Sequence, residues 1–192
     1  MPMIECTLIT GYAEKTRKLL AERMTDAASA TIGAHPDQVI VTIKEVLATN
    51  YMRGRINREP APAPTDPEII VREYLSAMEK RDLDKAKMHL ADEFTMVFPG
   101  GVNFKKIEDL ISWSSKRYKE VKKTFENFDT SLKGLNTTVF CSGYLHGTWL
   151  NGQPFSKIRF IDRFNVSNMK ITSQSVWNLS LIHISEPTRQ AS

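Results

Sequence analysis

A short segment that alternates proline with alanine constrains the folding of this 192-residue chain more than any other feature. Residues 59–65 read EPAPAPT. Proline lacks a backbone N–H and fixes its φ angle, so this composition favours an extended polyproline conformation and is excluded from the interior of a sheet or helix. We therefore predict two domains, at residues 1–58 and 67–178, joined by a Pro/Ala linker at residues 59–66.

The first domain is predicted to be a small β-α-β unit. Apolar and polar residues alternate over residues 3–9, and a second alternating, β-branched run covers residues 38–46. Between them, residues 13–32 carry apolar side chains at three- and four-residue spacing, and Gly33 is typical of a helix end. Strands joined by such a helix pair in parallel, and a unit of about sixty residues leaves apolar surface exposed. We therefore expect a homo-oligomer.

The second domain is predicted to be α+β, with three helices covering a curved, mainly antiparallel sheet in a cone around an apolar cavity. Asp66 and Pro67 supply an N-cap and a proline at the first helical position. The basic residues within 116–123 are interpreted as the solvated face of the third helix. Further helices are expected at residues 83–90 and 105–122, and strands at residues 94–98, 125–132, 137–150, 155–166 and 169–177.

Composition and charge exclude several classes of partner. The net charge is +4, but basic and acidic residues are interleaved, so we expect no nucleic-acid partner. Cys6 and Cys141 fall in different domains and lack cysteine or histidine at ligand spacing, so no metal site is expected. The N-terminus lacks a signal-peptide pattern and no apolar run is long enough to span a membrane. We expect no membrane partner and a cytoplasmic location.

The C-terminal segment is set apart from the functional argument. Residues 179–189 read LSLIHISEPTR, which resembles the one-frame translation of a transposase adapter used to prepare sequencing libraries. We therefore treat residues 179–192 as an artefact of this kind and expect the natural sequence to depart from this one near Asn178. The alternative is a genuine amphipathic tail.

The N-terminal proline carries the most specific chemistry in the sequence. Met1 before a small residue is normally removed, which leaves Pro2 as a free secondary amine at the start of a strand. With the strand, helix, strand order and the segment 50–55, residues 2–58 resemble the 4-oxalocrotonate tautomerase family. The resemblance implies dimers and usually hexamers, the N-terminal proline as catalytic base or acid, and no cofactor. Pro2 is therefore a candidate catalytic residue; the alternative is that it only favours removal of Met1.

Two residues of that family are replaced in this chain. The family's arginine after the first strand corresponds to Tyr12, and its arginine on the second strand corresponds to Ile40. Tyr51 matches the aromatic residue that lines the family pocket, and Arg53 and Arg55 are nearby replacements for the missing charge. We expect Tyr12, Tyr51, Arg53 and Arg55 to bind the substrate, with a dicarboxylate disfavoured; the alternative is that the two arginines are ordinary loop charges.

The second domain has its own resemblance. Residues 66–178, with Asp162 inside the run IRFIDRF and Trp177 near the end, resemble the SnoaL-like branch of the nuclear-transport-factor-2-like superfamily. Members include polyketide cyclases and ketosteroid isomerases, in which a pocket carboxylate moves protons next to a carbonyl, and also domains without catalysis. The fold alone does not decide between these activities.

Two residues of the second domain are candidates for its site. Alternation over residues 158–164 places Asp162 on one face with apolar neighbours, the setting of a general base. The alternative for Asp162 is a salt bridge to Arg159 or Arg163. His146 is a candidate for binding substrate in the same cavity, and its alternative is a buried, hydrogen-bonded histidine.

These features predict a cofactor-independent tautomerase or isomerase. Pro2 would move a proton in a small enol or keto acid, and the second domain would bind or isomerise a small carbonyl compound. Two alternatives stay open. One is a non-catalytic ligand-binding or assembly protein, and the other is isomerase or cyclase-like chemistry only in the second domain, at Asp162.

Overall fold

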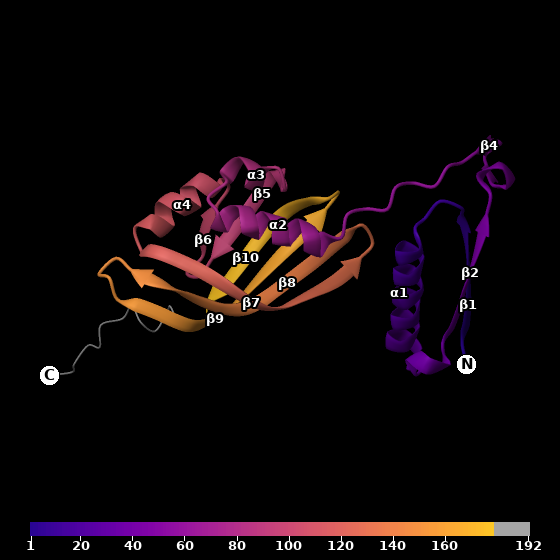
Figure 1. The fold of residues 1–192 in the computed structure, drawn as a ribbon, viewed down its shortest axis with the longest axis horizontal. Coiled ribbons are helices and arrows are strands. Elements are labelled where there is room, and N and C mark those ends of the chain that lie inside the picture. Colours follow the sequence, from indigo (N-terminus) through magenta and orange to yellow (C-terminus); the bar gives the residue numbers. More distant parts are fainter. Residues whose placement is uncertain (179–192) are drawn as a thin grey trace. The chain divides into compact units, whose positions relative to one another are not determined.

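The computed structural model describes residues 1–178, which form two compact units (Figure 1). The first unit is Met1–Pro64, and the second begins at Thr65. The adapter-like segment at residues 179–192 lies outside the described residues. Among the helices of the described part, none combines the length and the apolar character needed to cross a membrane.

The first unit has the predicted strand, helix, strand order. β1 (Met3–Ile9) and β2 (Ile40–Val46) pair in parallel, and α1 (Glu14–Ile32) connects them. Gly33 ends α1 in the left-handed conformation, with φ 70°, and its N–H bonds to the carbonyl of Ser29. A two-stranded hairpin, β3 (Met52–Arg53) and β4 (Ile56–Asn57), follows β2.

This first unit does not enclose a core of its own. None of its hydrophobic side chains is buried. A single helix on a two-stranded sheet is too small to cover the apolar surface that its strands present. Several of its large apolar side chains expose more than half of their surface: Met3, Ile32, Leu47, Met52 and Ile56.

The second unit is a mixed α+β fold with one curved sheet, as predicted. Its helices lie on one side of the sheet in Figure 1, and the strand order is β6-β5-β10-β9-β8-β7. Neighbouring strands are antiparallel except β5 and β10, which are parallel. The elements are α2 (Pro67–Glu79), α3 (Leu83–Lys87), β5 (Leu90–Phe98), β6 (Val102–Phe104), α4 (Ile107–Ser115), β7 (Tyr118–Lys133), β8 (Asn136–Trp149), β9 (Pro154–Ser167) and β10 (Lys170–Asn178).

The beginning of α2 is determined by the residues at its N-terminus. The side chain of Asp66 accepts a hydrogen bond from the backbone N–H of Glu68 at 3.0 Å, and Pro67 occupies the first helical position. One face of α2 then buries Ile70, Val71 and Tyr74 against the sheet. The ring of Tyr74 contacts that of Phe164 edge-on, with ring centroids 6.0 Å apart.

The predicted helix at residues 105–122 is wrong in its second half. α4 ends at Ser115, and residues 118–122 belong to the long strand β7. The hydroxyls of Ser114 and Ser115 bond to carbonyls three residues earlier, a local alternative that favours a helix end. The basic residues that follow therefore lie on a strand, where alternation turns Lys123 toward the interior while Lys122 stays exposed.

Gly143 provides a test of the pairing between β7 and β8. A methyl group added there would lie 1.9 Å from the carbonyl oxygen of Thr124, which is backbone and cannot swing away. We expect Gly143→Ala to lower the free energy of unfolding by about 3 kcal/mol, measured by denaturation of the second unit followed by tryptophan fluorescence.

The matched control is Gly134→Ala in the turn between the same two strands. No atom lies within 4 Å of the added methyl, but the φ of +61° disfavours a side chain. It should cost about 1 kcal/mol. Equal effects of the two substitutions would contradict the register described for these strands.

Candidate functional site

Pro2 lies at the beginning of the parallel ladder. Its carbonyl oxygen accepts a hydrogen bond from the backbone N–H of Ile40 at 3.0 Å, and Met3 is the first residue of β1. Pro2 is half-buried, whereas Met1 is 89% exposed. Ile40 stands at the position where the resemblance to the tautomerase family implies an arginine; it pairs with Met3 and is 39% exposed.

The predicted substrate-binding residues lie at the other end of the strands. β1 runs seven residues, about 20 Å, from Pro2 to the turn that carries Tyr12. Because β2 is parallel to β1, the hairpin with Tyr51, Arg53 and Arg55 also follows this far end, and Figure 1 shows β4 and the N-terminus at opposite ends of the unit. Within one copy, the structure does not bring these residues to Pro2.

The hairpin that carries the two arginines is well defined by its turn. Arg53 pairs with Ile56, so Gly54 and Arg55 form a two-residue loop. Their φ angles are 63° and 66°, as a type I′ turn requires. Arg53 and Arg55 are exposed, and Tyr51 is half-buried at the base of the hairpin.

Arg17 is a cation that sequence reasoning missed at this end. Its guanidinium donates to the carbonyl of Tyr12 and lies 3.3 Å from a carboxylate oxygen of Glu45. The signal in the sequence was a basic residue in the first turns of α1, close to the replaced arginine position. Its contacts tie the turn at Tyr12 to β2.

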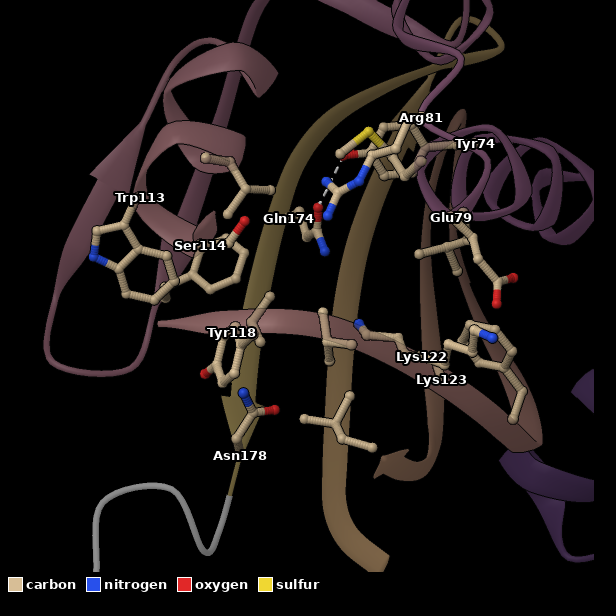
Figure 2. Close-up of a pocket in the computed structure, with 18 of the residues that line it drawn as sticks. Tyr74, Glu79, Arg81, Trp113, Ser114, Tyr118, Lys122, Lys123, Gln174 and Asn178 are labelled. Atoms are coloured by element: carbon tan, nitrogen blue, oxygen red, sulfur yellow. Dashed lines mark hydrogen bonds between the residues drawn. The ribbon is translucent and has the colours of Figure 1, made fainter. Parts of the chain in front are cut away.

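The second unit contains a cavity of about 180 Å³ between its helices and the sheet (Figure 2). Most of its lining is apolar and much of that is aromatic. Polar residues of α2, β7 and β10 also line it, among them Tyr74, Lys123 and Gln174. The aromatic members of the lining besides Tyr74 are Phe98, Trp113, Tyr118, Phe125 and Phe155.

A chain of polar contacts forms one wall of this cavity. Tyr74 donates its hydroxyl hydrogen to Oε1 of Gln174 at 3.2 Å, and Nε2 of Gln174 donates to Oδ2 of Asp162 at 3.4 Å. The ammonium group of Lys123 pairs with the same carboxylate oxygen and lies 4.5 Å from the ring centroid of Phe160. These contacts fix the orientation of the Gln174 amide.

Asp162 faces the interior as the alternation predicted, but its partner differs from the prediction. Its side chain is 0% exposed, and its salt bridge is to Lys123 on β7. Arg159 and Arg163 lie on the exposed face of β9, because adjacent residues of a strand point to opposite faces. Asp162 is not one of the residues that line the cavity; it lies behind Lys123 and Gln174.

His146 does not join the cavity. Its neighbour Leu145 is buried and lines the cavity, whereas His146 is not among the lining residues and lies where the register between β8 and β9 shifts. Alternation predicts only which residues of a strand share a face, and which face borders the cavity depends on the packing of the whole sheet. The structure also places Tyr74, Lys123 and Gln174 at the cavity, and the sequence did not single out these three residues.

Burial also sets the protonation of two neighbours of Asp162. Burial first, and the charge of Asp162 second, raise the pKa of the Tyr74 hydroxyl well above its usual value. The same two causes raise the pKa of the Cys141 thiol to about 12. Both groups therefore stay neutral near pH 7. Within residues 1–178, no cluster of three or more His, Cys, Asp or Glu residues is arranged to hold a metal ion.

Known proteins resemble the first unit. A "Probable tautomerase" of Bacillus cereus is 35% identical over 54 residues, which are 28% of this chain and 88% of the relative. A "Probable tautomerase" of Ralstonia nicotianae is 36% identical over 64 residues, 33% of this chain and 91% of the relative. These relatives indicate an isomerase-type class of activity. Through its first unit, the chain belongs to the tautomerase family. No protein-family model matches the chain.

Solved structures resemble the second unit. An NTF2-like protein of unknown function from Burkholderia pseudomallei aligns with a TM-score of 0.52 and 18% identity, covering 63% of this chain and 96% of that protein. An NTF2-like protein from Burkholderia thailandensis aligns with a TM-score of 0.53 and 16% identity, covering 65% of this chain and all of that protein. These likenesses show the fold, so the predicted α+β fold with a curved, mainly antiparallel sheet is confirmed.

The buried ion pair generates a stability prediction. Lys123→Met leaves the carboxylate of Asp162 buried without its cation, which should lower the free energy of unfolding by about 3 kcal/mol. The double variant Lys123→Met/Asp162→Asn removes both charges and should recover most of this loss. Denaturation followed by tryptophan fluorescence measures both.

The matched control is the adjacent residue on the same strand. Lys122 pairs with Glu120 at 2.9 Å, but both side chains are 55% exposed, so Lys122→Met should change stability by less than about 0.5 kcal/mol. A Lys123→Met variant as stable as Lys122→Met would show that the Asp162 pair does not hold this wall together.

Proposed function

We propose that this chain is a cofactor-independent tautomerase in which Pro2, freed by removal of Met1, moves a proton within a small enol or keto acid. The second unit binds a small carbonyl compound. The observation that carries the proposal is the position of Pro2 at the first rung of the parallel ladder, in a unit that belongs to the tautomerase family.

The proposed step is a proton transfer without change of oxidation state. The neutral amine of Pro2 accepts the hydroxyl proton of an enol as the C–O double bond forms. The electrons of the former carbon–carbon double bond then take a proton from the resulting ammonium, which regenerates the amine. Pro2 is half-buried, which favours the neutral amine, because desolvation disfavours the charged form.

Removal of Met1 is a condition of this chemistry. While Met1 is present, the nitrogen of Pro2 belongs to a tertiary amide and has no basic lone pair. The exposure of Met1 leaves its peptide bond accessible to an aminopeptidase. The processed chain begins with the secondary amine that the mechanism requires.

A second copy of the chain completes the proposed site. Tyr12, Tyr51, Arg53 and Arg55 lie a strand length away from the Pro2 of their own copy. The uncovered apolar surface of the first unit favours assembly into a dimer or hexamer. Assembly would bring the hairpin of one copy to Pro2 of another, where Arg53 or Arg55 would bind the single carboxylate of the substrate. With Ile40 beside Pro2, an acid with an aromatic body is favoured over a dicarboxylate.

Chemistry at Asp162 alone has weaker support. A general base must come within hydrogen-bond reach of the proton that it removes. Asp162 is 0% exposed and lies behind Lys123, so a ligand in the cavity would meet Lys123 and Gln174 first. We assign Asp162 the role of positioning Lys123.

The proposal predicts that Pro2→Ala abolishes proton transfer. Intact mass first establishes that Met1 is removed from the wild type and from the variant. Enol-to-keto conversion of phenylpyruvate and of 2-hydroxymuconate is then followed by absorbance. We expect kcat/KM of Pro2→Ala to fall at least about 100-fold, the weight of a positioned general base, and phenylpyruvate to be the better substrate of the wild type.

The control is Asp162→Asn in the second unit, which should leave this conversion within a factor of about two because the two sites are in separate units. Unchanged rates in Pro2→Ala would overturn the proposal. A loss confined to Asp162→Asn would move the chemistry to the second unit. Absence of turnover in the wild type, together with tight ligand binding, would identify a binding protein.

A further inference from the structure

The ion pair beside the cavity, Lys123 with Asp162, has its cation on the side of the cavity and its anion away from it. The carboxylate of Asp162 has no exposed surface and is outside the lining, whereas Lys123 is 25% exposed and belongs to the lining. A ligand in the cavity therefore meets the ammonium group, with its counter-ion held behind it. Although the pair is neutral as a whole, its positive end faces the cavity.

The amide next to the ion pair also presents a donor. Oε1 of Gln174 accepts from Tyr74, and one hydrogen of Nε2 is directed to Asp162. The second hydrogen of Nε2 and the remaining hydrogens of the Lys123 ammonium are left to bond elsewhere. This wall of the cavity therefore offers hydrogen-bond donors, which suits an oxygen acceptor and disfavours an amine.

The charged side chains of the lining also bear on the kind of ligand that the cavity would bind. Its lining contains three cationic side chains, Arg81, Lys122 and Lys123, and one anionic side chain, Glu79. Figure 2 shows the guanidinium of Arg81 reaching over Gln174, and no carboxylate among the described residues lies in salt-bridge range of it. Lys122 and Lys123 have counter-ions outside the lining, Glu120 and Asp162, so Arg81 is the cation of the lining whose charge would attract an anion entering the cavity.

We infer that the cavity of the second unit binds a small organic acid anion with an aromatic or branched body, and that an oxygen of the anion contacts Lys123 and Gln174. The volume of about 180 Å³ suits one ring with a short side chain, because a cavity of about 150 Å³ takes up benzene. The aromatic lining, which includes Trp113 and Phe125, packs against the body of the ligand. Asp162 is a positioning residue that holds the ammonium in place.

The inference rests on the proposed function only in that both units would bind acids of one class. Binding to the second unit is measured separately from turnover at Pro2. All three tryptophans, Trp113, Trp149 and Trp177, lie in the second unit, and Trp113 lines the cavity. Tryptophan fluorescence of the full chain therefore reports binding there. 3-Phenylpropionate is a suitable probe because it has no ketone and is no tautomerase substrate.

The experiment titrates the full chain with 3-phenylpropionate and with phenethylamine, which has a similar body but a positive charge. We expect the acid to bind at least about tenfold more tightly than the amine, the weight of one charge-assisted hydrogen bond. The variant Lys123→Met/Asp162→Asn should lose at least about tenfold in affinity for the acid and little for the amine. Lys119→Met, an exposed residue of β7 outside the lining, should bind the acid as the wild type does.

Two results would overturn the inference. One is that the wild type binds the amine as tightly as the acid, a result that does not depend on the folding of any variant. The other is unchanged acid affinity in the double variant, once its denaturation midpoint shows that it is folded. Pro2→Ala should bind the acid as the wild type does. Turnover of phenylpyruvate therefore tests the proposed function, and binding of 3-phenylpropionate tests this inference separately.

Discussion

Parallel pairing of β1 with β2 is the constraint on which the first unit depends. It fixes Pro2 at the start of the ladder and places both following turns at the far end, a strand length away. It also limits the unit to a two-stranded sheet with one helix, which leaves its apolar side chains without a core. Assembly with further copies would therefore satisfy two needs at once, because it covers this surface and brings a hairpin toward Pro2.

In the second unit, the arrangement of the cavity wall depends on the buried carboxylate of Asp162. An ionised group without exposed surface requires a cation and hydrogen-bond donors. Lys123 and Gln174 supply these to Oδ2 of Asp162, while Oδ1 is buried without a partner among the described residues; Lys123 and Gln174 are thereby held at the wall of the cavity. The sequence marked Asp162 as a candidate catalytic base; in our proposal it holds the positive charge of Lys123 at the cavity. Its negative charge also contributes to the raised pKa of Tyr74 and of Cys141.

Local patterns predicted most of the fold, and long-range contacts explain what they missed. The alternation in β1, the cap at Asp66 and the inward face of Asp162 follow from neighbouring residues. The end of α4, the parallel pairing of β5 with β10 and the partner of Asp162 depend on segments far apart in sequence. Lys123 is 39 positions from Asp162, and a register shift in β7 after Phe125 has no signature in the local sequence. Asp162 was thus singled out from the sequence, but Tyr74, Lys123 and Gln174, which are grouped with it across the sheet, were not.

The central claim is that Pro2 of one copy acts with the hairpin of another, and a mixing experiment tests it directly. Pro2→Ala chains and Arg53→Ala/Arg55→Ala chains, both without Met1, are unfolded together, refolded together and assayed with phenylpyruvate. Random assembly with shared sites places an intact Pro2 beside an intact hairpin in about a quarter of the sites. The account predicts recovery of activity toward this fraction of the wild type. Activity no higher than the average of the two separately refolded variants would contradict it.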